Sequence, residues 1–283
     1  MADLRPLDFG EILDGSLVIY RRHFGLFLKL AITALAAPVV LTVYFMMRFF
    51  ADVQQHPVRA LLILPVVLLY YVAMMLLTAG TIRIISDSYL GRTPRLQDAL
   101  SLGVSKIWPL IAVALGKSIV LVLIMFATIM VAVAAGAGLR GGGALLILVV
   151  AVVTGVGTWF TLYVACGYGV TTPIVVLEQL GSSFDAFGRS WELSRGFKLK
   201  ILGLATVAFL LCNIIPSQVL QALASAFMRT TPALGIGLTA GSILLPLVLA
   251  PVVASVITLI YYDLRVRREA FDLQMLGQQL GII

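Results

Sequence analysis

The sequence predicts an all-α integral membrane protein with six transmembrane helices arranged as three hairpins. Of its residues, 61% are hydrophobic, and the mean hydropathy is +1.07, far above that of an ordinary soluble domain. A short charged motif also recurs at a constant interval. Its acidic residues Glu11, Asp98 and Asp185 are spaced by 87 residues, and the same step leads on to Asp272.

Six apolar stretches are each long enough to cross a bilayer, which takes about 20 helical residues. They are Phe24–Phe49, Ala60–Ile82, Ser118–Leu139, Gly141–Leu177, Ile201–Met228 and Thr230–Tyr262. Hydrocarbon offers the backbone no hydrogen-bond partner, and these stretches do not alternate as barrel strands do, so each is predicted to be helical. Residues 1–283 are therefore expected to form a single membrane domain.

Each copy of the charged motif is predicted to start a short amphipathic helix before an odd-numbered span. Asp8 with Glu11, and Ser182 with Asp185, have the spacing of a capping box. In the second copy, the dipeptide 93–94 (Thr-Pro) suits a helix start. Because basic residues flank these helices, we expect them to lie in the cytoplasmic headgroup layer.

One unit then consists of an interfacial helix and a two-span hairpin. The units cover about residues 6–90, 93–180 and 182–263, followed by a cytoplasmic tail over 264–283. Since each unit crosses the membrane twice, all have the same polarity, which predicts a parallel three-fold internal repeat about the membrane normal. Three unrelated amphipathic linkers are the alternative interpretation.

The basic residues are distributed unevenly between the two predicted sides of the membrane. If the N-terminus and the connections after the even spans share one side, that side holds Arg5, Arg21, Arg22, Lys29, Arg83, Arg92, Arg95, Lys106, Arg189, Arg195, Lys198, Lys200, Arg265, Arg267 and Arg268. The other side holds Arg48, Arg59, Arg140 and Arg229. The positive-inside rule therefore places both termini in the cytoplasm.

The net charge of +7 favours anionic lipid headgroups as partners. Nucleic acid is not expected, because the basic residues follow the ends of spans and form no separate domain. The predicted lipid-headgroup collar consists of Arg21, Arg22, Lys29, Lys106, Lys117, Arg195, Lys198, Lys200, Arg265, Arg267 and Arg268. Lys117 stands close to the repeat equivalent of Lys29, so both are expected to extend to the headgroups; a ligand contact is the alternative for Lys117.

Acidic residues are the predicted contacts between units. Each even span ends with a lone acid, Asp87, Glu178 or Asp263, which we expect to pair with a basic residue of a neighbouring motif. A solvated carboxylate is the alternative. The full set of predicted inter-unit residues is Glu11, Asp98, Asp185, Asp272, Asp87, Glu178, Asp263 and Arg189. Within the third motif, Arg189 is also spaced to pair along the helix with Asp185 and Glu192.

The sequence offers no constellation for catalysis, metal binding or cofactor binding. His23 and His56 are predicted on opposite faces, and no HExxH, GxSxG or phosphate-binding loop occurs. The protein is therefore not expected to be an enzyme or to hold a cofactor. Within the spans, Asn213 near Pro216 is the best candidate for a polar kink, with simple packing as the alternative.

Three segments resemble a known family: Arg5-Pro-Leu-Asp-Phe-Gly-Glu-Ile-Leu-Asp-Gly-Ser with Tyr20–Phe24, Phe187-Gly-Arg-Ser-Trp-Glu-Leu-Ser-Arg-Gly196, and Tyr261–Leu273. They resemble the bacterial six-span family named glycerophosphoryl diester phosphodiesterase membrane domain. The resemblance implies a location in the bacterial inner membrane. In some members a separate soluble phosphodiesterase domain carries the catalysis. Nothing in this chain matches that domain, so no catalytic residue is carried over.

The leading expectation for function is a non-enzymatic inner-membrane protein that binds or moves a lipid-like or amphiphilic ligand, or serves as a membrane subunit. The alternative is a structural or regulatory module that docks a soluble cytoplasmic partner through its amphipathic helices. Expected partners are anionic membrane lipids, together with a partner protein or further copies of the chain.

Overall fold

The computed structural model describes residues 5–52, 63–138 and 143–269, and within these ranges the chain forms helices and no strand. The elements are α1 (Phe9–Arg22), α2 (Phe24–Asp52), α3 (Ile63–Tyr89), α4 (Leu96–Ser105), α5 (Ile107–Gly138), α6 (Gly143–Gly167), α7 (Thr171–Leu177), α8 (Asp185–Ser194), α9 (Lys198–Phe209), the π-helical turn η2 (Leu210–Ile214), α10 (Ile215–Phe227) and α11 (Pro232–Glu269). Asp272 lies outside the described residues.

Six stretches of helix are long and apolar enough to cross a membrane, as the sequence predicts. They are Phe24–Leu41, Leu64–Tyr89, Ile107–Gly138, Gly143–Leu177, Lys198–Phe227 and Pro232–Glu269. The chain is therefore a multi-pass membrane protein.

A short helix precedes the first, third and fifth of these stretches. α1 begins directly after Asp8, whose backbone N–H donates to the Glu11 carboxylate at 2.8 Å. α8 begins at Asp185, whose carboxylate accepts the Ser182 N–H at 2.8 Å. α4 begins at Leu96, later than the predicted start at 93–94, because Arg95 keeps an extended backbone with φ −122° and ψ 140°.

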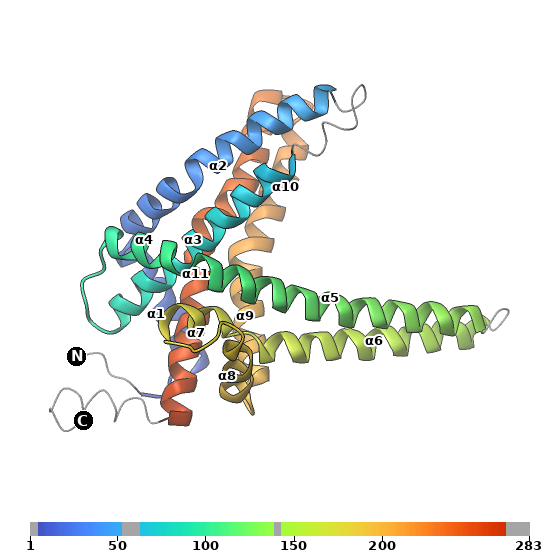
Figure 1. Ribbon diagram of the computed structural model, residues 1–283. Coiled ribbons are helices and arrows are strands. Elements are labelled where there is room, and N and C mark those ends of the chain that lie inside the picture. Colours follow the sequence, from blue (N-terminus) through green and yellow to red (C-terminus); the bar gives the residue numbers. More distant parts are fainter. Residues whose placement is uncertain (1–4, 53–62, 139–142, 270–283) are drawn as a thin grey trace.

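α11 is the central helix of the fold and packs against α1, α3, α9 and α10. Large side chains at its C-terminal half, such as Leu259, Ile260 and Tyr261, are almost completely buried and meet Ile12 of α1 and Leu204 of α9 in one hydrophobic core. The residues before α1 lie against the end of α11, so both ends of the described chain meet at one end of the molecule. We call this the charged end (Figure 1).

The α5–α6 pair differs from the rest of the molecule. The two helices pack along each other and extend together away from the other long helices (Figure 1). In the apolar segment of α5 only 6% of the residues are buried, and in that of α6 0% are. The corresponding share is 39% in both α3 and α11. The pair is close because Gly157 has no side chain: a Cβ there would lie 2.1 Å from the Thr128 methyl carbon. Most of the surface of this pair therefore has no protein neighbour within the described part of the chain.

Two of the long apolar stretches are not regular α-helices throughout. In the fourth, α6 ends at Gly167 and α7 restarts at Thr171. In the fifth, η2 inserts a π-helical turn between α9 and α10. Irregular backbone at membrane depth is tolerated where protein buries it or where it lines a cavity.

Candidate functional site

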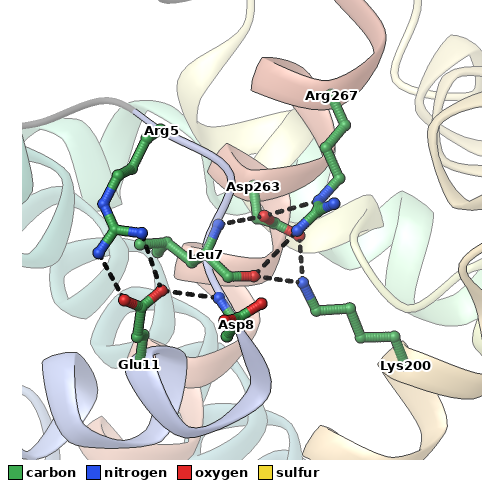
Figure 2. A network of polar contacts seen from close by, with 7 residues as sticks. All are labelled: Arg5, Leu7, Asp8, Glu11, Lys200, Asp263 and Arg267. Carbon is green, nitrogen blue, oxygen red and sulfur yellow. Dashed lines mark hydrogen bonds and ion pairs between the residues drawn. The ribbon is translucent and has the colours of Figure 1, made fainter.

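The first polar cluster of the charged end joins the N-terminal segment to α9 and α11 (Figure 2). Asp263, which is 1% exposed, accepts the Leu7 N–H at 2.8 Å and the Lys200 ammonium at 2.7 Å. Lys200 also donates to the Leu7 carbonyl at 2.7 Å. Arg267, one turn after Asp263, donates to both Asp263 and Leu7, at 2.9 and 3.0 Å. This carboxylate is thus fully neutralised by two cations and fixes the start of the chain.

Glu11 stabilises the same segment from the other side (Figure 2). Its carboxylate accepts the Asp8 backbone N–H and pairs with Arg5. The hydrogen bond from the Asp8 N–H and the contact with Arg5 hold the pKa of Glu11 below its usual value. Glu11 therefore acts within the first unit, as a helix cap and partner of Arg5.

The second polar cluster surrounds Glu178, which follows α7. Its carboxylate accepts the Tyr261 hydroxyl at 2.8 Å and the Arg189 guanidinium at 3.2 Å, while Arg265 Nε lies 4.0 Å away. Arg189 and Arg265 both also pair with Glu269 at the end of α11. Arg189 thus joins α8 to α7 and α11, instead of pairing along its own helix with Asp185 and Glu192.

Asp87, at the end of the second span, has a different partner from Glu178 and Asp263. Its side chain is 6% exposed, and Nε of Arg83, one turn earlier on α3, lies 3.0 Å from the carboxylate. Next to it, Ser86 hydrogen-bonds the Tyr262 hydroxyl at 2.6 Å. The ion pair of Asp87 therefore stays within α3 rather than reaching the next motif. Asp98 is exposed in the first turn of α4.

These contacts divide the predicted lipid-headgroup collar into two groups. The cations with protein partners are Lys106, Lys117, Lys200, Arg265, Arg267 and Arg268. Lys117 donates to the Tyr168 carbonyl at 3.4 Å, beyond the end of α6, so it caps that helix end rather than extending freely to the headgroups. Within the described ranges, no carboxylate forms an ion pair with Arg21, Arg22, Lys29, Arg195 or Lys198.

Arg195 and Lys198 come together because α8 docks on the end of α6. The Ser190 hydroxyl donates to the Gly167 carbonyl at 2.8 Å, and the Ser194 hydroxyl lies between the Trp191 and Gly167 carbonyls, at 3.1 and 3.3 Å. The Gly167 carbonyl, which has no partner within α6 because the helix ends there, thereby gains a hydrogen bond. The missing side chain of Gly167 also allows Trp191 to pack directly against the backbone, since a Cβ at Gly167 would lie 2.4 Å from the indole ring.

Lys198 occupies an aromatic setting without a counter-charge. Its ammonium lies 3.4 Å from the ring centroid of Tyr163 and 3.3 Å from that of Trp191. The nitrogen is buried and has no hydrogen-bond acceptor among the described residues. Cation–π attraction offsets part of the desolvation of an ammonium group, but a desolvated charge normally also requires an ion-pair or hydrogen-bond partner.

An open cleft of about 590 Å³ adjoins Lys198. It is lined by Tyr163, Trp191, Arg195, Gly196, Lys198 and Leu199. A second cleft of about 450 Å³ is also lined by Trp191 and Arg195. Gly196, which lines the larger cleft, turns the chain with φ +85°, a conformation that glycine adopts without strain. We call the larger cleft, with Arg195 and Lys198, the cation cleft.

The chemistry of the cation cleft suits an anion carried on an apolar body. Arg195 offers an exposed guanidinium, and the aromatic rings are of the kind found at membrane interfaces. Sequence reasoning had placed Arg195 and Lys198 in the collar and Trp191 on an apolar helix face, but it missed Tyr163 and Gly167. A tyrosine and a glycine inside an apolar run give no signal of their own.

The described part of the chain contains no cluster of three or more His, Cys, Asp or Glu residues that could hold a metal ion. His23 hydrogen-bonds Ser88 at 3.0 Å, and Cys166 and Cys212 are buried free thiols. No family model, curated protein or solved structure matches this chain.

Proposed function

We propose that the protein binds the anionic headgroup of a membrane amphiphile in the cation cleft. In this proposal it is a non-enzymatic membrane protein that holds or moves a lipid-like ligand, or that presents such a lipid as a membrane subunit. The observation that carries the proposal is the buried Lys198 ammonium, which faces aromatic rings and has no counter-charge among the described residues. An anion in the adjoining cleft would supply that charge.

The surroundings of the cation cleft fit the apolar part of such a ligand. Leu199 is 84% exposed at the cleft, and Trp159, one turn before Tyr163 on α6, is 65% exposed. Each basic residue near an anionic membrane surface contributes about 1 kcal/mol to the attraction. Arg195 and Lys198 together therefore favour an anionic lipid by roughly 2 kcal/mol, or a factor of about 30 in affinity.

The topology belongs to the same proposal. Both ends of the described chain lie at the charged end (Figure 1), and Arg268 of α11 donates to the carbonyl of Arg195, which lines the cation cleft. We place this end in the cytoplasm of a bacterial cell, by the positive-inside rule and by the family resemblance. The order of one short helix and two long apolar stretches, repeated three times, supports three units of one polarity.

The proposal is tested by lipid binding to the full chain in detergent, measured by native mass spectrometry with phosphatidylglycerol and phosphatidylcholine. We expect a preference for phosphatidylglycerol, which falls about fivefold in Arg195→Gln and in Lys198→Met. Arg22→Gln is the matched control, because it removes an exposed cation of α1 away from the cleft. Equal binding of both lipids, or equal losses in all three variants, would contradict the proposal.

The alternative, docking of a soluble partner, depends on the exposed faces of α1, α4 and α8. Arg189 is the basic residue that it would use on α8, and this side chain is held by Glu178 and Glu269. Glu192 of α8 remains exposed. If Glu192→Lys abolished association with a cytoplasmic protein while phosphatidylglycerol preference persisted, the docking function would be favoured.

A further inference from the structure

A separate cavity lies within the apolar part of the bundle, where α3, α7, η2 and α11 meet. It has a volume of about 270 Å³ and is partly open to the surface. Most of its lining is apolar, including Phe209, Val253 and Ile257. Thr78, Thr172 and Asn213 also line it, and no charged residue does. The cavity shares no residue with the cation cleft.

The π-helical turn brings Asn213 to this cavity. Pro216 has no backbone N–H, so it cannot donate to the Cys212 carbonyl as a regular helix requires. The helix accommodates this within η2, where the Ile215 N–H donates to the Leu210 carbonyl, five residues earlier. Single π-helical turns of this kind are frequent at functional sites.

Two of the three polar side chains of the cavity lack protein partners among the described residues, whereas the Thr78 hydroxyl donates to the Met74 carbonyl at 2.7 Å. Among the described residues, nothing forms a hydrogen bond with the Asn213 side-chain amide or with the Thr172 hydroxyl, although both residues line the cavity. Other span threonines are satisfied locally: Thr154 donates to Val150, and Thr161 donates to Gly157. A polar group at membrane depth without a partner costs free energy. These two side chains are therefore available to a ligand.

We propose that this cavity is a second binding site, which takes the uncharged, hydroxyl- or ester-bearing part of an amphiphile. The Asn213 amide can donate to an ester carbonyl and accept from a hydroxyl, and Thr172 can do the same. A charged headgroup would be desolvated there without a counter-charge, which excludes it. The volume holds a glycerol-sized group and the start of its chains, while the remaining hydrocarbon lies along the exposed helix surface.

The probe is a diacylglycerol with a photoreactive diazirine in one acyl chain, because it has a hydroxyl and two esters but no charge. The full chain is labelled in phosphatidylcholine vesicles, and labelled peptides are mapped. We expect labelling of the segments that line the cavity, and about a tenfold higher half-saturating concentration in Asn213→Leu and Thr172→Val. That loss corresponds to one hydrogen bond.

Matched controls separate the cavity from general effects on the membrane helices. Thr154→Val removes a hydroxyl that already bonds its own helix, and Gln218→Leu removes an exposed amide from α10. Both are expected to label like the wild-type chain. The proposal is overturned if all four variants label alike, if an alkane bearing the same diazirine labels the cavity equally well, or if labelling is confined to the apolar groove between α2 and α11, lined by Phe27, Leu28 and Leu244.

The outcome is independent of the cation cleft. Asn213→Leu and Thr172→Val should leave the preference for phosphatidylglycerol unchanged, whereas Arg195→Gln should leave diacylglycerol labelling unchanged. If the phosphatidylglycerol preference is absent but the cavity still labels, the proposed function fails and this second site stands.

Discussion

Lys198 and Lys200 stand two residues apart on α9 and have opposite surroundings. Lys200 is neutralised by Asp263 and bonded to the Leu7 carbonyl, whereas Lys198 lies between two aromatic rings and pairs with no carboxylate of the described residues. Successive residues of an α-helix are about 100° apart, so these two side chains leave the helix on nearly opposite faces. One face meets the buried end of α11, and the other meets the cation cleft. Within one cluster of basic residues, some cations can thus stabilise the fold through ion pairs while others remain available to an anionic ligand.

The largest effect is expected from the carboxylate at the structural face. Asp263→Ala leaves Lys200 and Arg267 without their counter-charge, and the Leu7 N–H without its acceptor. We expect a loss of roughly 3 kcal/mol, at the lower end for a broken buried ion pair because both cations are partly exposed. Thermal unfolding in detergent measures it. Asp14→Ala, which removes an exposed carboxylate from α1, should change little.

The two lysines themselves give the sharpest comparison. Lys200→Met should destabilise the protein by about 2 kcal/mol, because Asp263 stays buried and loses one of its two cations. Lys198→Met, by contrast, removes a desolvated charge and keeps an unbranched chain between the rings. Its unfolding temperature should equal or exceed that of the wild type in detergent without anionic lipid. Equal destabilisation by both variants would show that the two faces do not differ.

Gly167→Ala tests whether α8 must touch the end of α6 to form the cation cleft. The new Cβ would lie 2.4 Å from the Trp191 ring, which is packed against Lys198 and Tyr163 and cannot move freely. We expect a loss of about 2 kcal/mol, as for overpacking in a core, together with a weaker phosphatidylglycerol preference. Gly155→Ala is the control, because nothing lies within 4 Å of its added Cβ.

The smallest expected effect is on how the stability of the fold depends on pH under acidic conditions. The pKa of Glu11 is lowered in the folded state, so its ionised form stabilises the fold above the unfolded-state pKa of about 4.3. This stabilisation is lost as the pH falls through the lower, folded-state pKa. The difference in unfolding temperature between wild type and Glu11→Gln should therefore shrink on acidification from pH 6 to pH 3. A constant difference would show that the charge of Glu11 is irrelevant.

Sequence reasoning reached the outline of the fold because membrane helices leave a strong signal. The apolar stretches predicted six spans, and the capping pattern at Asp8 and Glu11 marked the start of α1. Sequence reasoning predicted the ion-pair partners of individual side chains less well. The spacing of Arg189 suggests pairs within α8, but Glu178 and Glu269 hold it, because the tertiary fold brings two carboxylates closer than the exposed neighbours on its own helix. The start of α4 was also displaced.

For the cation cleft and the second cavity, too, the sequence predicted some of the residues and not others. Composition and charge placement identified Arg195, Lys198 and Lys200 as one basic group, yet they could not separate Lys200 from the other two. Asn213 was marked as a polar kink, but its cavity needs Thr78 and Thr172 from two other elements. Tyr163 and Gly167 became visible only as neighbours of Lys198 and Trp191. Such contacts join residues far apart in the chain, which no local pattern encodes.

The sequence by itself determined that this is a helical multi-pass membrane protein, because the absence of water in hydrocarbon forces long apolar stretches into helices. The tertiary structure alone decided which cations are neutralised, since ion pairing depends on distances between elements and not on spacing along the chain. It likewise decided that α5 and α6 extend away from the bundle. Their uniformly apolar sequences are compatible with both protein and lipid as neighbours, so only the packing of the other helices could settle their position.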